Sequence, residues 1–160
     1  QGERAQDRIG PVADKAAVFS MLQRGGKVYS QHVERVTAEN LQPIVQQMIT
    51  EDAKLISDTG VVSRHLGQGR EHHLVNHSND EYVRWEEGFC VTTNTIEGFF
   101  SLLKRGINGV YHQVGRKHLH RYLSEFDFRY NNRKVTDGER AQLALKGFDG
   151  KRLTYKGSDR

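Results

Sequence analysis

The stretch NTIEGFFSLLKRG, from Asn94 to Gly106, decides the fold prediction. Its apolar residues recur every three or four positions, which predicts a helix with one face on a core. Glu97 and Lys104 are seven residues apart, or two helical turns, so they share one side of this helix. A carboxylate and an ammonium aligned in this way can hold a metal ion and a phosphate together. The alternative is a solvated helix edge, in which Asn94 and Glu97 form a capping box of structural value only.

Two further helices are expected downstream. The segment 117–131 repeats the helical apolar pattern after a glycine-containing link. Thr136 and Glu139 then have the spacing of a capping box, which predicts a short helix that ends at Gly147.

The region before the Asn94–Gly106 stretch alternates short strands with one helix. Segments 16–22 and 28–33 are rich in β-branched and aromatic residues, and the turn signal Arg24–Lys27 between them predicts a β-hairpin. Thr37 is the expected N-cap of a helix over residues 38–49. A strand at 54–57 follows, and this strand–helix–strand order predicts a crossover unit with parallel strands.

Residues 72–76 are a further predicted strand, and residues 78–91 are predicted to form an irregular loop. The single Cys90 excludes an internal disulfide and fits a reducing cytosol. No apolar run approaches membrane-spanning length, so no membrane partner is expected. The first residues show neither a signal-peptide pattern nor an initiator Met, so we expect the beginning of the protein to be missing from this chain.

Positive charge is concentrated in the second half of the chain. Residues 1–80 carry nine Lys and Arg against ten Asp and Glu, whereas residues 81–160 carry fifteen against ten. A basic half with interleaved aromatic residues favours a polyanionic partner, most simply nucleic acid. A solvated basic face is the alternative. The residues expected to contact DNA phosphates are Lys104, Arg105, His112, Arg116, Lys117, Arg121, Arg129 and Arg133.

Asp58 ends the predicted strand at 54–57, at the kind of position where open α/β sheets place ligands. If a helix packs across the sheet, Asp58 and Glu97 can converge. Converging carboxylates need a cation, and oxygen ligands select Mg²⁺ or Mn²⁺. His65, His72, His73 and His77 have no partner cysteines and no spacing typical of zinc, so they are expected at the surface or at strand edges.

The sequence NTIEGFFSLLKRGINGVYHQVGRKHLHRYLSEFDFRYNNR, residues 94–133, resembles the catalytic region of bacterial insertion-sequence transposases with the ISXO-like transposase domain. Matching segments are RGGKV at 24–28, NHS at 76–78 with EYVR at 81–84, and the ending TDGER…GKRLTY. These proteins belong to the DDE superfamily, which has an RNase H-like fold. The resemblance covers about residues 15–155.

The resemblance implies cutting and joining of DNA ends, with a divalent metal held by two aspartates and a third acidic or amide residue. Asp58 matches the second aspartate, Glu97 the helix acid and Lys104 the basic residue after it. Asn94 is a competing third residue, and Glu97 is favoured because a carboxylate binds Mg²⁺ more strongly than an amide does. Asp7 and Asp14 do not match the first aspartate, and the aromatic residues common after the second one are missing.

These observations predict an α/β domain with an RNase H-like mixed sheet flanked by helices and lacking its first strand. Residues 1–14 are expected to be a flexible leader, 15–135 a partial catalytic domain and 136–160 a short helix and tail. The expected protein is a transposase fragment, inactive alone, that acts as a homo-oligomer on double-stranded DNA of element ends and target, in the bacterial cytoplasm at the nucleoid. The alternative is a non-catalytic DNA-binding or regulatory remnant.

Overall fold

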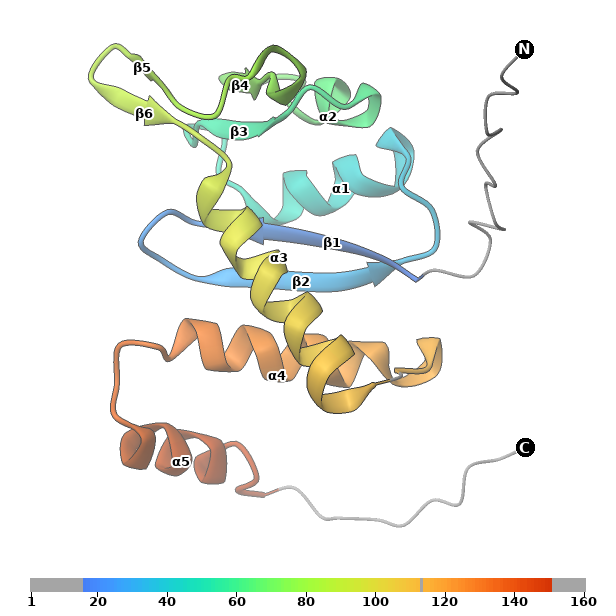
Figure 1. Cartoon of the computed structure of the whole chain (residues 1–160), viewed down its shortest axis with the longest axis vertical. Coiled ribbons are helices and arrows are strands. Elements are labelled where there is room, and N and C mark those ends of the chain that lie inside the picture. Colours follow the sequence, from blue (N-terminus) through green and yellow to red (C-terminus); the bar gives the residue numbers. More distant parts are fainter. Residues whose placement is uncertain (1–15, 113, 151–160) are drawn as a thin grey trace, which may run out of the picture.

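The computed structural model describes residues 16–112 and 114–150, which form an α/β arrangement of short strands and helices (Figure 1). The strands are β1 (Ala17–Leu22), β2 (Val28–Val33), β3 (Leu55–Asp58), β4 (His72–Val75), β5 (Arg84–Glu86) and β6 (Phe89–Val91). The helices are α1 (Ala38–Met48), α2 (Val61–Leu66), α3 (Asn94–Gly106), α4 (Leu119–Asn131) and α5 (Asp137–Lys146). Within these residues, no helix is both long enough and apolar enough to cross a membrane.

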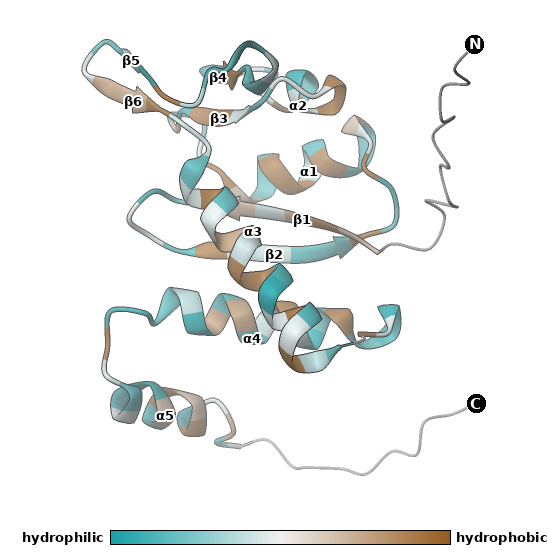
Figure 2. Cartoon of the chain, viewed as in Figure 1, coloured by the Kyte–Doolittle hydropathy of each residue, from teal (hydrophilic) through white to brown (hydrophobic). Residues whose placement is uncertain are grey.

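Strands β1 and β2 form the predicted antiparallel hairpin, which is buried on both faces. Alternate side chains of β1 point to opposite faces. Phe19 and Met21 pack with α1 in one core cluster, whereas Val18 and Leu22 pack with α3 and α4 in the other. The double burial explains why β1 is apolar along most of its length (Figure 2).

Helix α1 follows from the predicted N-cap. The Thr37 hydroxyl accepts a hydrogen bond from the Asn40 backbone N–H. Leu41 and Val45 are buried among residues of the hairpin, of β3 and of α2. Helix α1 therefore packs against both the hairpin and the segment that carries Asp58.

The predicted crossover unit, which joined the strand before α1 to β3, is wrong. Strand β3 pairs in parallel with β4 rather than with β2, and the short helix α2, which the sequence analysis missed, makes the connection. The described residues form three two-stranded sheets, β1–β2, β3–β4 and β5–β6, instead of the single mixed sheet that was expected. The α/β class is confirmed at this coarser level.

The predicted loop at 78–91 is also wrong, because it contains the β5–β6 hairpin. Glu87 and Gly88 both have positive φ, at 45° and 83°, as the tightest two-residue hairpin turns require. Gly88 adopts a positive φ without steric cost because it lacks a Cβ, whereas Glu87 does not. The turn is therefore less obvious in the sequence than Asn-Gly would be.

Helices α3 and α4 cover the face of the β1–β2 hairpin opposite α1, and Phe99, Leu103, Leu119 and Leu123 form that core. The helices meet at Gly106, where an added Cβ would lie 2.1 Å from Phe126 Cζ. The link between them begins with a π-helical turn at Ile107–Tyr111. Helix α5 has the predicted capping box between Thr136 and Glu139.

Candidate active site

Asp58 is the last residue of β3, and its side chain is exposed. Its Oδ1 accepts hydrogen bonds from the Ser63 hydroxyl at 2.8 Å and from the Gly60 backbone N–H at 3.2 Å. These contacts hold the carboxylate over the start of α2. Asp58 Oδ2 has no hydrogen-bond partner within residues 16–112 and 114–150, so one oxygen remains available to a ligand.

The neighbouring strand β4 ends at the same edge, because Asp58 and Val75 are partners in the parallel register. The chain then turns at Asn76, whose side chain accepts a hydrogen bond from the Ser78 N–H at 3.1 Å. The Asn76 N–H donates to Glu81 Oε2 at 2.9 Å. This turn places His77 two residues after the carboxyl end of β4.

Glu97 projects from the first turns of α3 and contacts His77. Glu97 Oε1 lies 3.1 Å from His77 Nε2 and accepts a hydrogen bond from the Thr93 hydroxyl at 2.5 Å. The predicted capping box is therefore wrong: the N-cap is Thr93, and Asn94 is the first residue of the helix. The Glu97 carboxylate bonds to side chains instead of to the backbone N–H that a capping box requires.

Asn94 and Lys104 are both exposed on α3. The Asn94 backbone N–H donates to Thr92 Oγ1 at 3.2 Å, and its side-chain amide makes no hydrogen bond to the described parts of the chain. Lys104 forms neither an ion pair nor a hydrogen bond through its ammonium there. Both side chains are available for a ligand.

The structure brings Glu97 to the edge at which β3 and β4 end, but no hydrogen bond or ion pair joins Asp58 to Glu97 directly. Across the residues that the structure describes, no three His, Cys, Asp or Glu side chains form a group that could hold a metal ion. Among the described residues, Asp58 and Glu97 each keep one carboxylate oxygen without a hydrogen-bond partner, and such an oxygen suits Mg²⁺ or Mn²⁺. The two residues fit as part of a ligand set rather than as a whole one.

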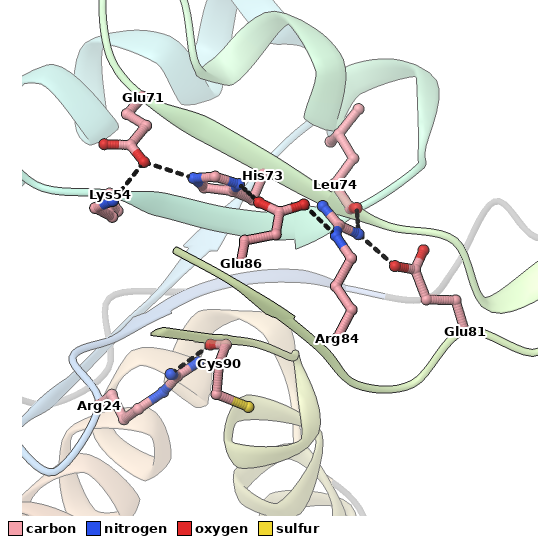
Figure 3. A network of polar contacts seen from close by, with 9 residues as sticks. All are labelled: Arg24, Lys54, Glu71, His73, Leu74, Glu81, Arg84, Glu86 and Cys90. Atoms are coloured by element: carbon pink, nitrogen blue, oxygen red, sulfur yellow. Dashed lines mark hydrogen bonds and ion pairs between the residues drawn. The ribbon is translucent and has the colours of Figure 1, made fainter. Parts of the chain in front are cut away.

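A charged network fixes the β5–β6 hairpin beside β4 (Figure 3). Arg84 bonds to Glu81, to Glu86 and to the Leu74 carbonyl. His73 lies between two carboxylates, with Nε2 2.8 Å from Glu71 and Nδ1 2.6 Å from Glu86. The hydrogen bonds from Arg84 lower the pKa of both Glu81 and Glu86.

Arg24 joins this hairpin to β1–β2. Its guanidinium donates to the Cys90 carbonyl at 2.6 Å (Figure 3). It also donates to the Thr92 carbonyl at 3.5 Å. Strand β6 leads through Thr92 and Thr93 into α3. The network and Arg24 together therefore fix the position at which α3 begins, and with it the position of Glu97.

All eight residues predicted to contact DNA are exposed. Some of them also have structural contacts: for example, Arg129 pairs with Glu125 at 2.7 Å, and Arg133 donates to the Gly26 and Tyr130 carbonyls. In the described residues, Lys104, Arg105, Lys117 and Arg121 have no ion-pair partner. Arg121 lines a shallow cavity of about 310 Å³ together with His118, Tyr122 and Glu125.

Tyr111 lies in the π-helical turn, where its hydroxyl donates to Glu125 Oε2 at 2.8 Å and its ring packs edge-on against Tyr122. This hydrogen bond raises the pKa of the Tyr111 hydroxyl. Tyr111 therefore belongs to the packing between the π-helical turn and α4. His112, next to it, is exposed.

Sequence reasoning selected Asp58 and Glu97 but missed His77 and Thr93. Their roles depend on a contact between segments sixteen residues apart. The available signal was the Asn-His-Ser sequence immediately after β4, at a strand end where ligands commonly bind.

Comparison with protein-family models places this α/β chain among the transposases. The matching model is the ISXO2-like transposase domain, and the match covers residues 1–131, so the chain belongs to this family. The match includes residues 1–14, which the resemblance in the sequence did not cover, and it ends before the TDGER segment. No curated protein and no solved structure matches the chain.

Proposed function

We propose that this chain is part of the catalytic domain of a DNA transposase that cuts and joins DNA strands at insertion-sequence ends. The observation that carries the proposal is the contact of Glu97 with His77, which lies two residues after the end of β4, and β4 pairs with the strand that ends at Asp58. Two carboxylates from different elements at one sheet edge are a common arrangement for phosphoryl transfer with divalent metal. Membership of a transposase family supplies DNA as the substrate.

In this proposal Asp58 and Glu97 are metal ligands, and Lys104 holds a phosphate of the DNA backbone. Asn94, one turn before Glu97, is the competing third residue. A pair of Mg²⁺ or Mn²⁺ ions, when bound, supplies activation of a water or 3′-hydroxyl and stabilisation of the leaving oxygen. Ser63 and the Gly60 N–H orient the Asp58 carboxylate, while Thr93 and His77 orient that of Glu97.

An RNase H-like sheet with one further strand is part of the same proposal. Strand β1 pairs with β2 and strand β3 pairs with β4, so each has one edge without a ladder in the described residues. A strand between β1 and β3 would join the two pairs into one mixed sheet and would bring the first aspartate next to Asp58. Without that aspartate, the chain alone is expected to hold metal poorly and to be inactive. We expect the active protein to be a homo-oligomer on DNA in the bacterial cytoplasm.

The test is metal-dependent nicking of supercoiled plasmid by a version of the protein extended at its N-terminus to include the first aspartate. Asp58→Asn and Glu97→Gln should each abolish nicking in Mg²⁺ and in Mn²⁺. Matched controls are Glu39→Gln on α1 and Asp149→Asn after α5, both exposed acidic residues outside the site. Full nicking by the Asp58 and Glu97 variants would disprove the assignment.

The second candidate function is DNA binding without catalysis. Two observations favour it. Lys104, Arg105, Lys117 and Arg121 are exposed and have no ion-pair partner among residues 16–112 and 114–150, and the metal-ligand set of these residues is incomplete. Salt-dependent DNA binding by the extended protein, without nicking in either metal, would support this function over the first.

A further inference from the structure

His77 lies within hydrogen-bond distance of two side chains of the α3 start. Its Nε2 is 3.0 Å from Thr93 Oγ1 and 3.1 Å from Glu97 Oε1. Thr93 is 7% exposed, so its hydroxyl needs partners inside the protein. These three side chains form one small polar group between the end of β4 and the start of α3.

The donors and acceptors of this group can be assigned. The Thr93 hydroxyl donates its hydrogen to Glu97 Oε1, so its lone pairs can only accept. Glu97 as a carboxylate can only accept as well. Thr93 Oγ1 and Glu97 Oε1 therefore both act as acceptors toward the imidazole. His77 Nε2 must carry the hydrogen and donate it to both oxygens.

The His77 ring is itself held by its surroundings. Its backbone follows the Asn76 turn, which the hydrogen bond from the Asn76 N–H to Glu81 fixes. The ring packs against Tyr82 with centroids 5.5 Å apart. Arg84 in turn bonds to Glu81. A rigidly held donor restricts the rotamer of the flexible Glu97 side chain, which is otherwise half-exposed.

We propose that His77 is a positioning residue for the Glu97 carboxylate: it holds Oε1 so that Oε2 is available to a divalent cation. The proposal rests on the proposed function, in which Glu97 binds the metal. Side chains that hold a metal ligand in place typically change metal affinity about 10–100-fold when they are removed. A role of His77 limited to packing would leave metal affinity unchanged as long as the chain folds.

The experiment uses the full chain with ¹³C in the carboxyl groups of its glutamates, and Mn²⁺ as the probe. Paramagnetic broadening detects weak binding, and Glu97→Gln identifies the Glu97 resonance by its loss. In the wild-type chain, Mn²⁺ should broaden the Glu97 signal before those of other glutamates. His77→Ala should require about 10–100-fold more Mn²⁺ for the same broadening.

Two further variants keep the test decisive. His77→Gln retains a side-chain N–H donor and should preserve most of the wild-type response, and it replaces His77→Ala if that variant fails to fold. His65→Ala, an exposed histidine on α2, should respond as the wild type does. Equal Mn²⁺ response of wild type and His77→Ala would overturn the role of His77 alone. A wild-type chain in which Mn²⁺ shows no preference for Glu97 would overturn the metal site of this chain, and the role of His77 with it.

Discussion

Asn131 on α4 and Val28 on β2 exchange two hydrogen bonds. The Val28 N–H donates to Asn131 Oδ1 at 2.7 Å, and Asn131 Nδ2 donates to the Val28 carbonyl at 2.9 Å. One turn earlier, Asp127 accepts from the Ser30 N–H at 2.6 Å and from the Ser30 hydroxyl at 2.7 Å. Helix α4 thus satisfies the outer edge of β2 with side chains, where a sheet would use another strand. An edge covered in this way is protected from pairing with another chain.

Replacing Asn131 with Ala should destabilise the fold, because it leaves the buried Val28 N–H and carbonyl without partners. The expected loss in the free energy of unfolding is about 1–3 kcal/mol, measured by urea denaturation. Arg129→Ala, on the exposed side of the same helix, should change it by less than about 0.5 kcal/mol. Equal stability of Asn131→Ala and wild type would show that water replaces these hydrogen bonds without cost.

Asp127 should make the fold less stable as the pH rises. Burial raises the pKa of its carboxyl, against the lowering effect of the Ser30 hydrogen bonds. The folded state therefore binds more protons than the unfolded state, and the stabilisation is present below the ordinary value of 3.8. It is lost as the pH rises through the raised folded-state pKa.

Asp127→Asn removes this titration while keeping an oxygen that accepts from Ser30. Urea denaturation at a series of pH values from 3.8 upward should show a flatter profile for Asp127→Asn than for the wild type. Asp149→Asn, an exposed aspartate after α5, should retain the wild-type profile. Identical profiles for Asp127→Asn and wild type would show that Asp127 does not contribute.

Gly106→Ala should destabilise the contact between α3 and α4. The new methyl would lie 2.1 Å from Phe126 Cζ, and overpacking of this kind costs about 1–3 kcal/mol. Thermal or urea denaturation measures the loss. Gly98→Ala is the matched control in the same helix, because nothing lies within 4 Å of its added Cβ, and it should stabilise by up to about 1 kcal/mol.

Shortening Phe126 tests the cause of the Gly106→Ala effect. Phe126→Leu should cost less stability in the Gly106→Ala background than in the wild type, because the two changes share one contact. If the stability losses of Gly106→Ala and Phe126→Leu were strictly additive, the Gly106→Ala effect would not come from its contact with Phe126.

Arg84→Met should loosen the β5–β6 hairpin without unfolding the chain. It removes the hydrogen bonds to Glu81, Glu86 and the Leu74 carbonyl. Faster hydrogen exchange in 84–91, with α4 unchanged, is the expected result. Lowering the pH should also loosen the hairpin. The ion pairs of Glu81 and Glu86 stabilise it fully above pH 4.5, the ordinary pKa, and this stabilisation is lost as the pH falls through their lowered folded-state pKa values. Arg64→Met, an exposed change on α2, should leave exchange at 84–91 unaltered.

Arg121→Ala should weaken DNA binding and make it less sensitive to salt. Arg121 is exposed and lacks an ion-pair partner in the described chain, so it can replace a phosphate counterion. Losing one phosphate contact should reduce the slope of log K against log salt by about 0.9. Arg140→Ala should keep the slope, because Arg140 bonds to the Asn132 and Val135 carbonyls and to Asp137. An unchanged slope for Arg121→Ala would contradict the prediction that α4 contacts DNA phosphates.

The elements predicted correctly are those with strong local signals. The β1–β2 hairpin has a Gly-Gly turn, α1 has Thr37 as N-cap, and α3 and α4 have clear apolar stripes. The pairing of β3 was wrong because a four-residue strand carries no information about its partner. Strand β5 was missed because two of its three residues, Arg84 and Glu86, are charged, as is typical of a loop. Their ion pairs with each other, with Glu81 and with His73 account for these charges within a strand.

The candidate site shows the same division. Asp58 and Glu97 stood out because a strand end and a helix face are readable from local pattern. Asn94 was assigned the wrong cap position, because the hydroxyl of Thr93 bonds to Glu97 instead of to a backbone N–H. The contact of His77 with Glu97 depends on how β4, β6 and α3 are arranged in space, which no local pattern encodes.

If Glu97 binds metal and Lys104 holds a DNA phosphate, as proposed, helix α3 would set the distance between the phosphate contact and the cutting site. Its buried Phe99 and Leu103 keep the helix rigid between Glu97 and Lys104. Seven residues of α-helix span about 10 Å, and one strand of duplex DNA rises about 3.4 Å per nucleotide. A phosphate held by Lys104 would therefore lie about three nucleotides from the bond that is cut. Inserting or deleting a residue between the two positions would rotate Lys104 away from the strand as well as shift it. In the proposed function, the helix would therefore set both the distance and the angular position of the phosphate contact relative to Glu97.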